Sequence, residues 1–475
     1  MKWKQGNKIL IKAGTGKGKT YFVKNELIKQ ADDWDQKILF LSNRKALREQ
    51  TSLEIKEADK QDIIQVMTYQ KFERQIFNGT VDISGFKYIV CDEAHYFFSD
   101  ATFNRMTNLG LEYVKNHTDD KIVILMSATP SRIKAYFQVP DELTYELKNE
   151  YSYISEIFTY TDQETLINLL NSLPENEKVI YFSSAEKALK VSQEVRGSAF
   201  ICSKNNPWRN FSNQKELENI QIYSKFECRA LCTTKILDNG VNIIDSNLKH
   251  IVVDMLDIDT VIQCIGRKRV QSSEDTITLY IADKSYASLQ TRHYSISKAL
   301  EQAICLRDQG EKAFRKEYRK QDYDKYLIDI DEDVIRVNEA GAWKYAQLKR
   351  EYDEMMKIKQ GFVEFLLRQM GMGKRRTKSL EKTIEKKSLE DFLRGLIEVK
   401  IFESDKKVVQ DSILEKMIGK IERNKEKLGL ASINAIFSDL DIPYVFRSYK
   451  ETRGEFRNKW YWVLEEKQTT APKSA

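Results

Sequence analysis

The sequence predicts two α/β domains with parallel sheets, followed by a mainly α-helical C-terminal region. Up to about residue 290, short β-branched or apolar runs alternate with amphipathic, charged stretches, and beyond that point long charged segments with helical spacing take over. Strands that alternate with helical stretches favour parallel sheets joined by crossover helices. The length of 475 residues agrees with this organisation, because it accommodates about two to four domains of ordinary size.

Apolar runs mark the predicted strands. Those before residue 130 are Lys8–Lys12, Lys37–Leu41, Ile63–Met67, Tyr88–Cys91 and Lys121–Met126. Those after it are Lys178–Phe182, Ala199–Cys202, Ala230–Thr233, His250–Val253 and Thr276–Ile281. The gap between the two sets contains Pro140 and the polar stretch Lys148–Ser155. We therefore expect one α/β domain at residues 1–148 and a second at residues 149–287.

Residues 288–404 are expected to form a charged helical region. Within Trp343–Met370, apolar residues recur at steps of three and four, which is typical of an amphipathic helix. The stretch Gly371–Lys378 that follows has the composition of a basic turn. These helices either brace the preceding domains or offer a docking surface for a protein partner, and the sequence does not decide between the two.

Residues 405–475 have a different pattern. We expect helices at Asp411–Lys427 and Ser432–Leu440, then strands at Tyr444–Tyr449 and Lys459–Leu464 around a turn at Arg453-Gly454. Helices followed by a two-stranded ribbon are compatible with a winged-helix-like module. Alternation along the ribbon predicts that Val445, Tyr461 and Val463 face its core.

Composition excludes several classes of protein. No run approaches the roughly 18 apolar residues of a membrane-spanning helix. The N-terminus lacks the apolar segment of a signal peptide, so no export is expected. The 6 cysteines form no Cys-x-x-Cys pair and no cluster with histidine, which argues against a zinc site or a disulfide framework. Free thiols without an export signal indicate the cytoplasm.

The net charge of +6 is unevenly placed along the chain. Residues 1–290 sum to −1, whereas residues 291–475 sum to +7. The C-terminal part therefore carries the whole basic excess, which favours its contact with an acidic partner such as nucleic acid.

A glycine-rich loop follows the first predicted strand. It reads Ala13-Gly14-Thr15-Gly16-Lys17-Gly18-Lys19-Thr20 and precedes a helical stretch. A phosphate-binding P-loop requires this order of strand, loop and helix. Its glycines let backbone N–H groups point at phosphate oxygens, Lys19 supplies a positive charge to them, and the Thr20 hydroxyl is a ligand for Mg²⁺. Ala13 stands where the strict pattern has glycine.

Two carboxylates follow the fourth predicted strand, in the sequence Asp92-Glu93-Ala94-His95. The end of a parallel strand places them at the sheet edge where ligands bind. Asp92 can hold Mg²⁺ through water, and Glu93 can polarise the water that attacks a phosphoryl group.

With this pair of motifs the chain resembles a superfamily 2 helicase with a DEAH-type box. Other segments resemble the remaining motifs of that family in their usual order: Leu41–Leu47, Thr68–Phe72, Ser127–Pro130, Tyr181–Ser184, Thr233–Ile243 and Gln263–Arg269. The resemblance covers residues 8–283. The small size and the unfamiliar C-terminal third favour a phage or mobile-element origin.

The resemblance implies two RecA-like domains with ATP and Mg²⁺ at their interface. It assigns hydrolysis to Lys19, Glu93, Gln263, Arg267 and Arg269. It assigns nucleotide binding to Gly14, Thr15, Gly16, Lys17, Gly18, Lys19, Thr20, Asp92, Gly240 and Asn242, with Thr20 and Asp92 as the magnesium ligands. His95, Ser127 and Thr129 would couple the nucleotide to the gap between the domains.

The same resemblance implies a strand of nucleic acid on the opposite face. Its contacts would come from Arg44, Thr68, Tyr69, Ser183 and Thr234. These contacts would go mostly to phosphate and sugar, so they would be independent of base sequence.

Two departures from the family pattern affect these assignments. The last arginine of motif VI usually stands seven residues after the glutamine, but Val270 occupies that place here and Arg269 comes one residue earlier. Arg269 is still the expected arginine finger, and Arg267 is the better-matched position. Only twelve residues precede Ala13, so we expect either weak selectivity for the base of the nucleotide or contacts with the adenine from elsewhere in the chain.

The predicted C-terminal ribbon is rich in aromatic and basic residues. Tyr444–Trp462 contains seven aromatic residues and five lysines or arginines. Interleaved rings and cations suit base stacking and phosphate neutralisation, although the same alternation fits a ribbon packed on its own helices. The candidate contacts are Arg447, Lys450, Arg453, Arg457 and Trp460.

We therefore expect an ATP-dependent helicase or translocase that acts on DNA rather than RNA. The compact motor and the winged-helix-like end favour DNA. An RNA remodelling helicase is one alternative. Another is an ATP-gated binding module that recruits a partner and unwinds nothing.

Overall fold

A computed structural model describes residues 3–14, 18–43, 60, 62–102, 104–147, 151–238, 241–331, 334–417 and 428–467. The chain divides into two compact units. The first comprises residues 1–155, 175–277 and 283–375, and the second comprises residues 156–174, 278–282 and 376–475. The predicted domain bounds at residues 148, 287 and 404 stay predictions. Across the described part of the chain, no helix has both the length and the apolarity to cross a membrane.

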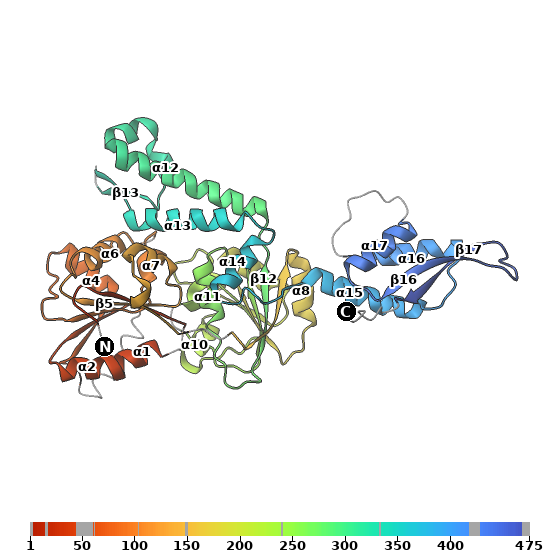
Figure 1. The fold of residues 1–475 in the computed structure, drawn as a ribbon, viewed down its shortest axis with the longest axis horizontal. Helices are drawn as coiled ribbons and strands as arrows, with labels where there is room; N and C mark the ends of the chain where they lie inside the picture. Colours follow the sequence, from red (N-terminus) through yellow and green to blue (C-terminus); the bar gives the residue numbers. More distant parts are fainter. Residues whose placement is uncertain are drawn as a thin grey trace, which may run out of the picture. The chain divides into compact units, whose positions relative to one another are not determined.

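The first unit contains a six-stranded parallel sheet with the order β3-β2-β4-β5-β1-β6 (Figure 1). The strands are β1 Lys8–Ala13, β2 Ile38–Ser42, β3 Ile64–Thr68, β4 Tyr88–Cys91, β5 Ile122–Ser127 and β6 Thr144–Leu147. β5 pairs in parallel with both β1 and β4. The carboxyl ends of these three strands therefore meet at one edge, where the P-loop and Asp92-Glu93 begin.

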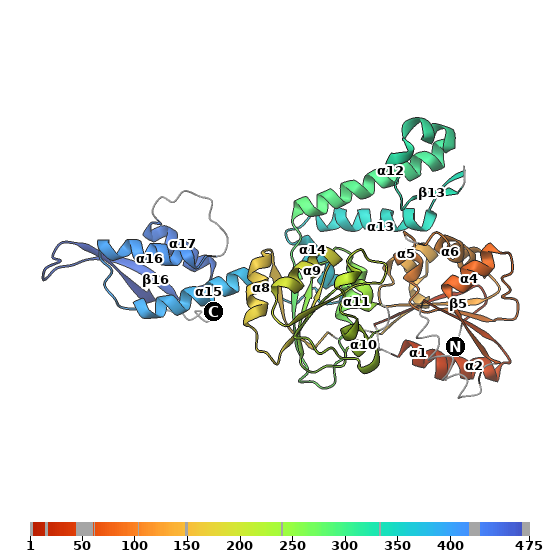
Figure 2. The same cartoon turned by 180° about the vertical axis from the view of Figure 1, so that it is seen from behind.

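Helices cover both faces of this sheet, as Figure 2 shows from behind. They are α1 Lys19–Tyr21, a π-helical segment Phe22–Leu27, α2 Ile28–Asp33, α4 Tyr69–Phe77, α5 Tyr96–Ser99, α6 Thr107–Asn116 and α7 Ser131–Phe137, with a 3-10 turn at Asp141–Leu143. Because side chains alternate along a strand, Ile9 packs into the core that includes α2, whereas Leu10 packs into the core that includes α4 and α6.

The strands of a second parallel sheet fall partly in each unit. In the first unit, β11 Leu248–Val253, β8 Lys178–Phe182, β10 Ala230–Thr233 and β9 Ser198–Ile201 are neighbours in this order. α9 Ala185–Glu194, α10 Gln214–Tyr223 and α11 Ile258–Ile265 follow β8, β9 and β11, with 3-10 turns at Arg209–Phe211 and Lys235–Asp238. Side-chain caps begin these helices; the Asp257 carboxylate, for example, accepts from the Thr260 backbone N–H at 2.9 Å.

The first unit also contains a helical arm. It consists of α12 Tyr286–Glu317, a 3-10 turn Lys320–Asp322, the antiparallel strands β13 Ile328–Asp331 and β14 Val334–Val337, α13 Glu339–Met355 and α14 Gly361–Gln369. Both views show α12 and α13 side by side (Figures 1 and 2). The short β13–β14 hairpin was not predicted.

The single amphipathic helix predicted over Trp343–Met370 is wrong, because two helices occupy this stretch. The chain turns sharply at Gln360, whose φ is 55°. At Gly361 a Cβ would lie 1.7 Å from the backbone oxygen of Met355, so only glycine allows this close approach. The apolar spacing continues across the break, which explains why periodicity alone predicted one helix.

The second unit contains three neighbouring strands in the order β15 Lys378–Ser379, β7 Ile154–Tyr160 and β12 Ile277–Ala282. The first residues of β7 and β12 belong to the first unit. α8 Gln163–Ser172 follows β7, and α15 Leu380–Leu393 follows β15 with a 3-10 turn at Arg394–Leu396. All predicted strands of the two sheets are present within two residues of their expected bounds, whereas β6, β7 and β15 were not predicted.

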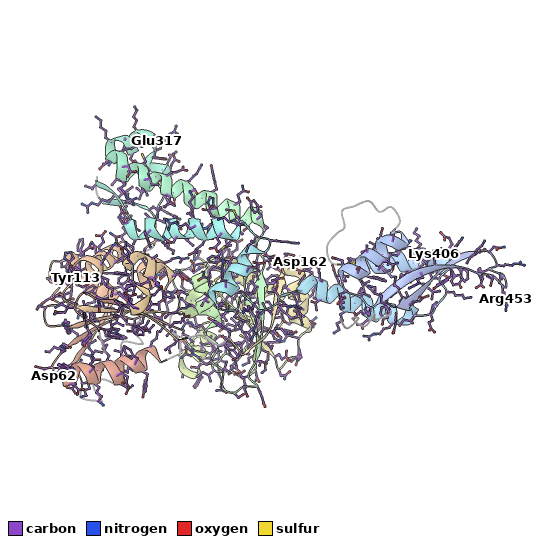
Figure 3. All side chains as sticks on the ribbon, in the orientation of Figure 1. Asp62, Tyr113, Asp162, Glu317, Lys406 and Arg453 are labelled. Carbon is purple, nitrogen blue, oxygen red and sulfur yellow. The ribbon has the colours of Figure 1, made fainter. Side chains whose placement is uncertain are left out.

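The end of the second unit contains α16 Glu403–Glu415, α17 Leu430–Asp439 and an antiparallel ribbon of β16 Tyr444–Lys450 and β17 Trp460–Glu466. Figure 3 shows Arg453 at the tip of this ribbon. α16 begins eight residues before the predicted helix Asp411–Lys427, whose residues 418–427 lie outside the described residues. Isolated bridges from Ile397 and Ile401 to β17 add a third short segment beside the ribbon.

The ribbon buries the opposite face from the one predicted. Phe446, Trp462 and Leu464 lie in the core with α16 and α17, whereas Val445, Tyr461 and Val463 are only half-buried. Both faces carry aromatic or β-branched residues, so the alternation could not show which one packs inward. The fold class is otherwise as predicted: parallel-sheet α/β domains of RecA-like type, and a mainly helical C-terminal region.

Candidate nucleotide site

The glycine-rich loop has the predicted surroundings at both ends. β1 ends at the buried Ala13, and α1 begins at Lys19. Gly18 precedes α1 with a φ of 83°, a left-handed conformation that favours glycine. Thr15, Gly16, Lys17 and the side chain of Thr20 lie outside the described residues.

Lys19 and Glu93 form a buried ion pair at the sheet edge. The Lys19 Nζ lies 2.9 Å from Glu93 Oε1, and the two residues are 7% and 9% exposed. Asp92, beside Glu93, is also buried. The pair brings together two of the predicted site residues, Lys19 at the start of α1 and Glu93 in the turn after β4.

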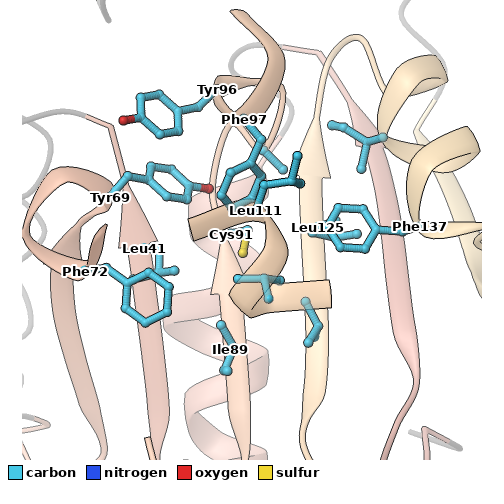
Figure 4. Close-up of a cluster of buried hydrophobic side chains, with 14 of the residues drawn as sticks. Leu41, Tyr69, Phe72, Ile89, Cys91, Tyr96, Phe97, Leu111, Leu125 and Phe137 are labelled. Atoms are coloured by element: carbon cyan, nitrogen blue, oxygen red, sulfur yellow. The ribbon is translucent and has the colours of Figure 1, made fainter. Parts of the chain in front are cut away.

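The turn that carries Glu93 is held by its neighbours. Glu93 has a φ of 48°, which is unusual for a residue other than glycine. The Tyr69 hydroxyl donates to the backbone oxygen of Asp92 at 2.9 Å, and the Ala94 N–H donates to the backbone oxygen of Met126 at 2.8 Å. Figure 4 shows Tyr69 against Tyr96 above the end of β4, and the two rings stack at 4.5 Å.

His95 connects this turn to the second α/β domain. Its Nδ1 lies 3.4 Å from Glu93 Oε2 and 3.2 Å from Ser127 Oγ, and its Nε2 lies 2.8 Å from Gln263 Nε2 on α11. An amide nitrogen can only donate, so Nε2 of His95 accepts and Nδ1 carries the proton. The Ser127 hydroxyl also accepts from the Thr129 backbone N–H at 3.1 Å. Polar contacts thus run from Lys19 through Glu93 and His95 to Gln263.

The two arginines of the last motif lie in different surroundings. Arg267 is 2% exposed, whereas Arg269 is half-buried and donates from Nε and Nη2 to Asn242 Oδ1 at 2.8 and 2.7 Å. Lys268 between them is buried and bonds both carboxylate oxygens of Asp275 at 2.7 Å. Asn242, a predicted nucleotide ligand, thus contacts the predicted arginine finger, and Gly240 lies outside the described residues.

The side chains predicted to contact nucleic acid are mostly inside. Tyr69 is fully buried, so its side chain supports Asp92 and cannot reach a bound strand. The Thr68 hydroxyl caps α4 by accepting from the Lys71 N–H, and the Ser183 hydroxyl donates to the Asp254 backbone oxygen. Thr234 is half-buried, and Arg44 lies outside the described residues.

A buried charge cluster that the sequence did not reveal joins three parts of the first unit. Arg132 on α7 is 6% exposed. Its Nη1 donates to Asp259 Oδ2 on α11 at 2.6 Å, and its Nε and Nη2 donate to both carboxylate oxygens of Glu351 on α13 at 3.2 and 2.8 Å. Asp259 and Glu351 stand 127 and 219 positions after Arg132 in the sequence. No local sequence pattern connects residues so far apart.

The pKa values of Asp257 and Asp259, the two aspartates at the start of α11 beside this cluster, shift in opposite directions. Burial raises the pKa of Asp259 to about 7, although Arg132 opposes the shift. Burial acts in the same sense on Asp257, but Arg132, Lys344 and the Thr260 hydrogen bonds outweigh it and bring its pKa to about 2. Arg132 thus opposes the effect of burial on both Asp257 and Asp259, and Lys344 acts in the same sense.

The described donor set fits a magnesium nucleotide. Lys19 offers a buried ammonium for phosphate oxygens, and Asp92 offers a buried carboxylate for the metal, directly or through water. Glu93 stands beside both and can polarise a water.

Residues 1–132 match the family model of the type III restriction enzyme, res subunit. No curated protein matches the chain. Similar solved structures include Saccharomyces cerevisiae Dbp5 bound to RNA and ADP BeF3 (17% identity, 62% of this chain and 84% of that chain, TM-score 0.40). Another is a DEAD box protein from the hyperthermophile Methanococcus jannaschii (17% identity, 62% and 87%, TM-score 0.34). The family match spans the residues that include Lys19, Asp92 and Glu93, and together with the site geometry it supports an ATPase/helicase enzyme.

Replacement of Arg132 by alanine leaves the half-buried carboxylates of Asp259 and Glu351 without their cation. We expect the free energy of unfolding to fall by about 3–5 kcal/mol, the usual result of breaking a buried ion pair from one side. Urea unfolding of the full chain measures it. Lys134→Ala, on the same helix and in an exposed pair with Asp141, is the control and should cause no resolvable change. Equal stability of the two variants would contradict this role of Arg132.

Proposed function

We propose that the chain is an ATP-dependent helicase or translocase of the DEAH type, which moves along a strand of nucleic acid, with DNA as the preferred track. The observation that supports this most directly is the continuous set of contacts from Lys19 through Glu93 and His95 to Gln263. Such a connection lets the state of the nucleotide alter the contact between two α/β domains. Movement on a strand requires this coupling.

Phosphate oxygens of ATP compete with Glu93 for the Lys19 ammonium. Nucleotide binding thus releases the Glu93 carboxylate, which can then orient a water and accept its proton. Mg²⁺, when bound near Asp92 and Thr20, supplies charge neutralisation on the phosphates. Glu93 also contacts His95, so this release changes the contacts of the ring that bonds Gln263.

Arg269 suits the role of the arginine finger better than Arg267. It is half-buried rather than enclosed, and its guanidinium donates to a side-chain oxygen of Asn242, which phosphate oxygens can replace. An arginine supplied to the γ-phosphate is worth roughly 10³–10⁵ in rate in related nucleotidases. The buried Arg267 is better suited to positioning this segment.

The test of this function is ATP hydrolysis by the full chain with single-stranded DNA, duplex DNA or RNA. Lys19→Ala and Glu93→Gln should each lower the stimulated rate by at least about a hundredfold, because each removes a group that acts on the phosphates or the water. Lys29→Ala and Glu26→Gln, at exposed positions of the following helical segment, are matched controls with wild-type rates. Unchanged turnover in the first two variants would overturn the assignment.

We place a duplex-binding surface on the β16–β17 ribbon. Arg447 is exposed beside Glu465 at 3.1 Å, Trp460 is 57% exposed, and the charged tip around Arg453 extends away from α16 and α17 in Figure 3. The order α15, the bridged segment 397–401, α16, α17 and the ribbon supports a winged-helix-like module.

The double variant Arg453→Glu and Arg457→Glu should weaken duplex DNA binding and reduce the salt slope by about two, because each phosphate contact contributes about one counterion. Fluorescence anisotropy at several salt concentrations measures both quantities. Arg394→Glu, an exposed arginine outside the ribbon, is the control. If the double variant and the control share the wild-type salt slope, the ribbon is not the duplex surface.

A further inference from the structure

The loop between β9 and α10 presents two aromatic rings to solvent. This aromatic loop, residues 203–212, contains Trp208 and Phe211, which are 38% and 59% exposed. Their ring centroids lie 6.2 Å apart with an interplanar angle of 46°. Burying such rings is favourable by roughly 25 cal/mol per Å² of apolar surface. Two neighbouring exposed rings therefore indicate a contact surface.

Hydrogen bonds fix the shape of the aromatic loop. The backbone N–H groups of Arg209, Phe211 and Ser212 donate to residues three positions earlier, at 3.1 Å each. The Trp208 N–H donates to Asn206 Oδ1 at 3.0 Å, and Ser212 Oγ accepts from the Cys202 N–H at 3.1 Å. The loop is thus closed on itself and tied to the end of β9. A preformed loop offers its rings without an ordering cost on binding.

The charged residues of the aromatic loop and of its junction with α10, up to Lys215, have one sign. Residues 203–215 include Lys204, Arg209 and Lys215, all exposed, and no aspartate or glutamate. Exposed rings among cations match the chemistry of a single strand of nucleic acid, in which base faces alternate with phosphates. A protein partner with an apolar surface would offer no counter-charge for the three cations.

The aromatic loop begins on the same sheet edge as the predicted strand contacts. Ile201, the last residue of β9, is opposite Thr233 of β10, whose hydroxyl donates to the Ile201 backbone oxygen at 3.1 Å. Thr233 is opposite Phe182 of β8, and Ser183 follows it directly. Because neighbouring strands are about 4.8 Å apart, the loop starts within about 10 Å of both Thr234 and Ser183.

We propose that Trp208 and Phe211 form a base-stacking platform for a single strand of nucleic acid, while Lys204 and Arg209 bind the flanking phosphates. The proposal rests on the proposed function, since it needs a strand along this edge. It gives the motor a hold on bases in addition to its contacts with phosphate and sugar. Stacking accepts every base, so the hold stays independent of sequence.

The test compares the full-length wild type with the double variant Trp208→Ala and Phe211→Ala. Fluorescence anisotropy is read with a labelled oligo-dT strand and with an abasic strand of equal length. The variant should bind oligo-dT at least about fivefold more weakly, because alanine replacement of a stacked ring costs at least about that factor. Binding to the abasic strand should change less than about twofold. Trp208→Tyr, which keeps a ring, should bind oligo-dT nearly as the wild type does.

Ile222→Ala with Tyr223→Ala is the matched control. These residues are 70% and 67% exposed at the other end of α10, about 14 Å along the helix from Gln214, and the pair should bind both strands as the wild type does. Equal binding of oligo-dT by the wild type and the Trp208 and Phe211 variant would overturn the platform alone. An equal loss on oligo-dT and abasic strands would also overturn it. A wild type that binds neither strand would overturn the proposed function as well. Matching melting temperatures verify that each variant is folded.

Discussion

The hydrogen bond between His95 and Gln263 is the interaction on which the proposed mechanism depends. It joins the turn after β4 to α11, and on its other side the imidazole contacts Glu93 and Ser127. The position of the ring is set by local structure, because Glu93 adopts a left-handed φ and Tyr69 and Met126 anchor the neighbouring backbone. A neutral imidazole donates a hydrogen bond from one ring nitrogen and accepts one at the other, whereas a carboxylate can only accept and an ammonium can only donate.

A single neutral hydrogen bond contributes only about 0.5–1.5 kcal/mol, so it cannot by itself hold two domains together. The Arg132 cluster is better suited to that task, because removing one partner of a buried ion pair costs about 3–5 kcal/mol. Arg132 joins α7, which directly follows the Ser127–Pro130 segment, to α11 and to α13 of the helical arm. The Arg132 cluster thus supports the contact between the domains, while the hydrogen bond between His95 and Gln263 can break and re-form as the nucleotide changes. The sequence did not decide whether the helical arm braces the α/β domains or binds a protein partner. The contact between Arg132 and Glu351 shows that the arm does brace them.

Local sequence patterns predicted much of the fold and drew attention to the P-loop and Asp92-Glu93 as the candidate nucleotide site. Buried strands are continuous apolar runs, and the P-loop and Asp92-Glu93 are defined by neighbours in the chain. β6 and β13 were not predicted because they are short and polar. The break between helices at Gly361 was not predicted because the apolar spacing continues through it. The Arg132 partners depend on the folded chain, since 127 and 219 positions separate them. Tyr69 was misassigned for the same reason: its motif lies at the expected place, but tertiary packing turns its ring inward.

The proposed mechanism requires His95 and Gln263 to act as a pair in hydrolysis. A double-mutant cycle with His95→Ala, Gln263→Ala and the combined variant, read as nucleic-acid-stimulated ATP hydrolysis, tests it most directly. If the bond carries the coupling, the second replacement adds little to the first, so the combined variant has the rate of the slower single variant. If the two losses multiply, His95 and Gln263 act independently, and the proposed connection between nucleotide and domain interface is contradicted.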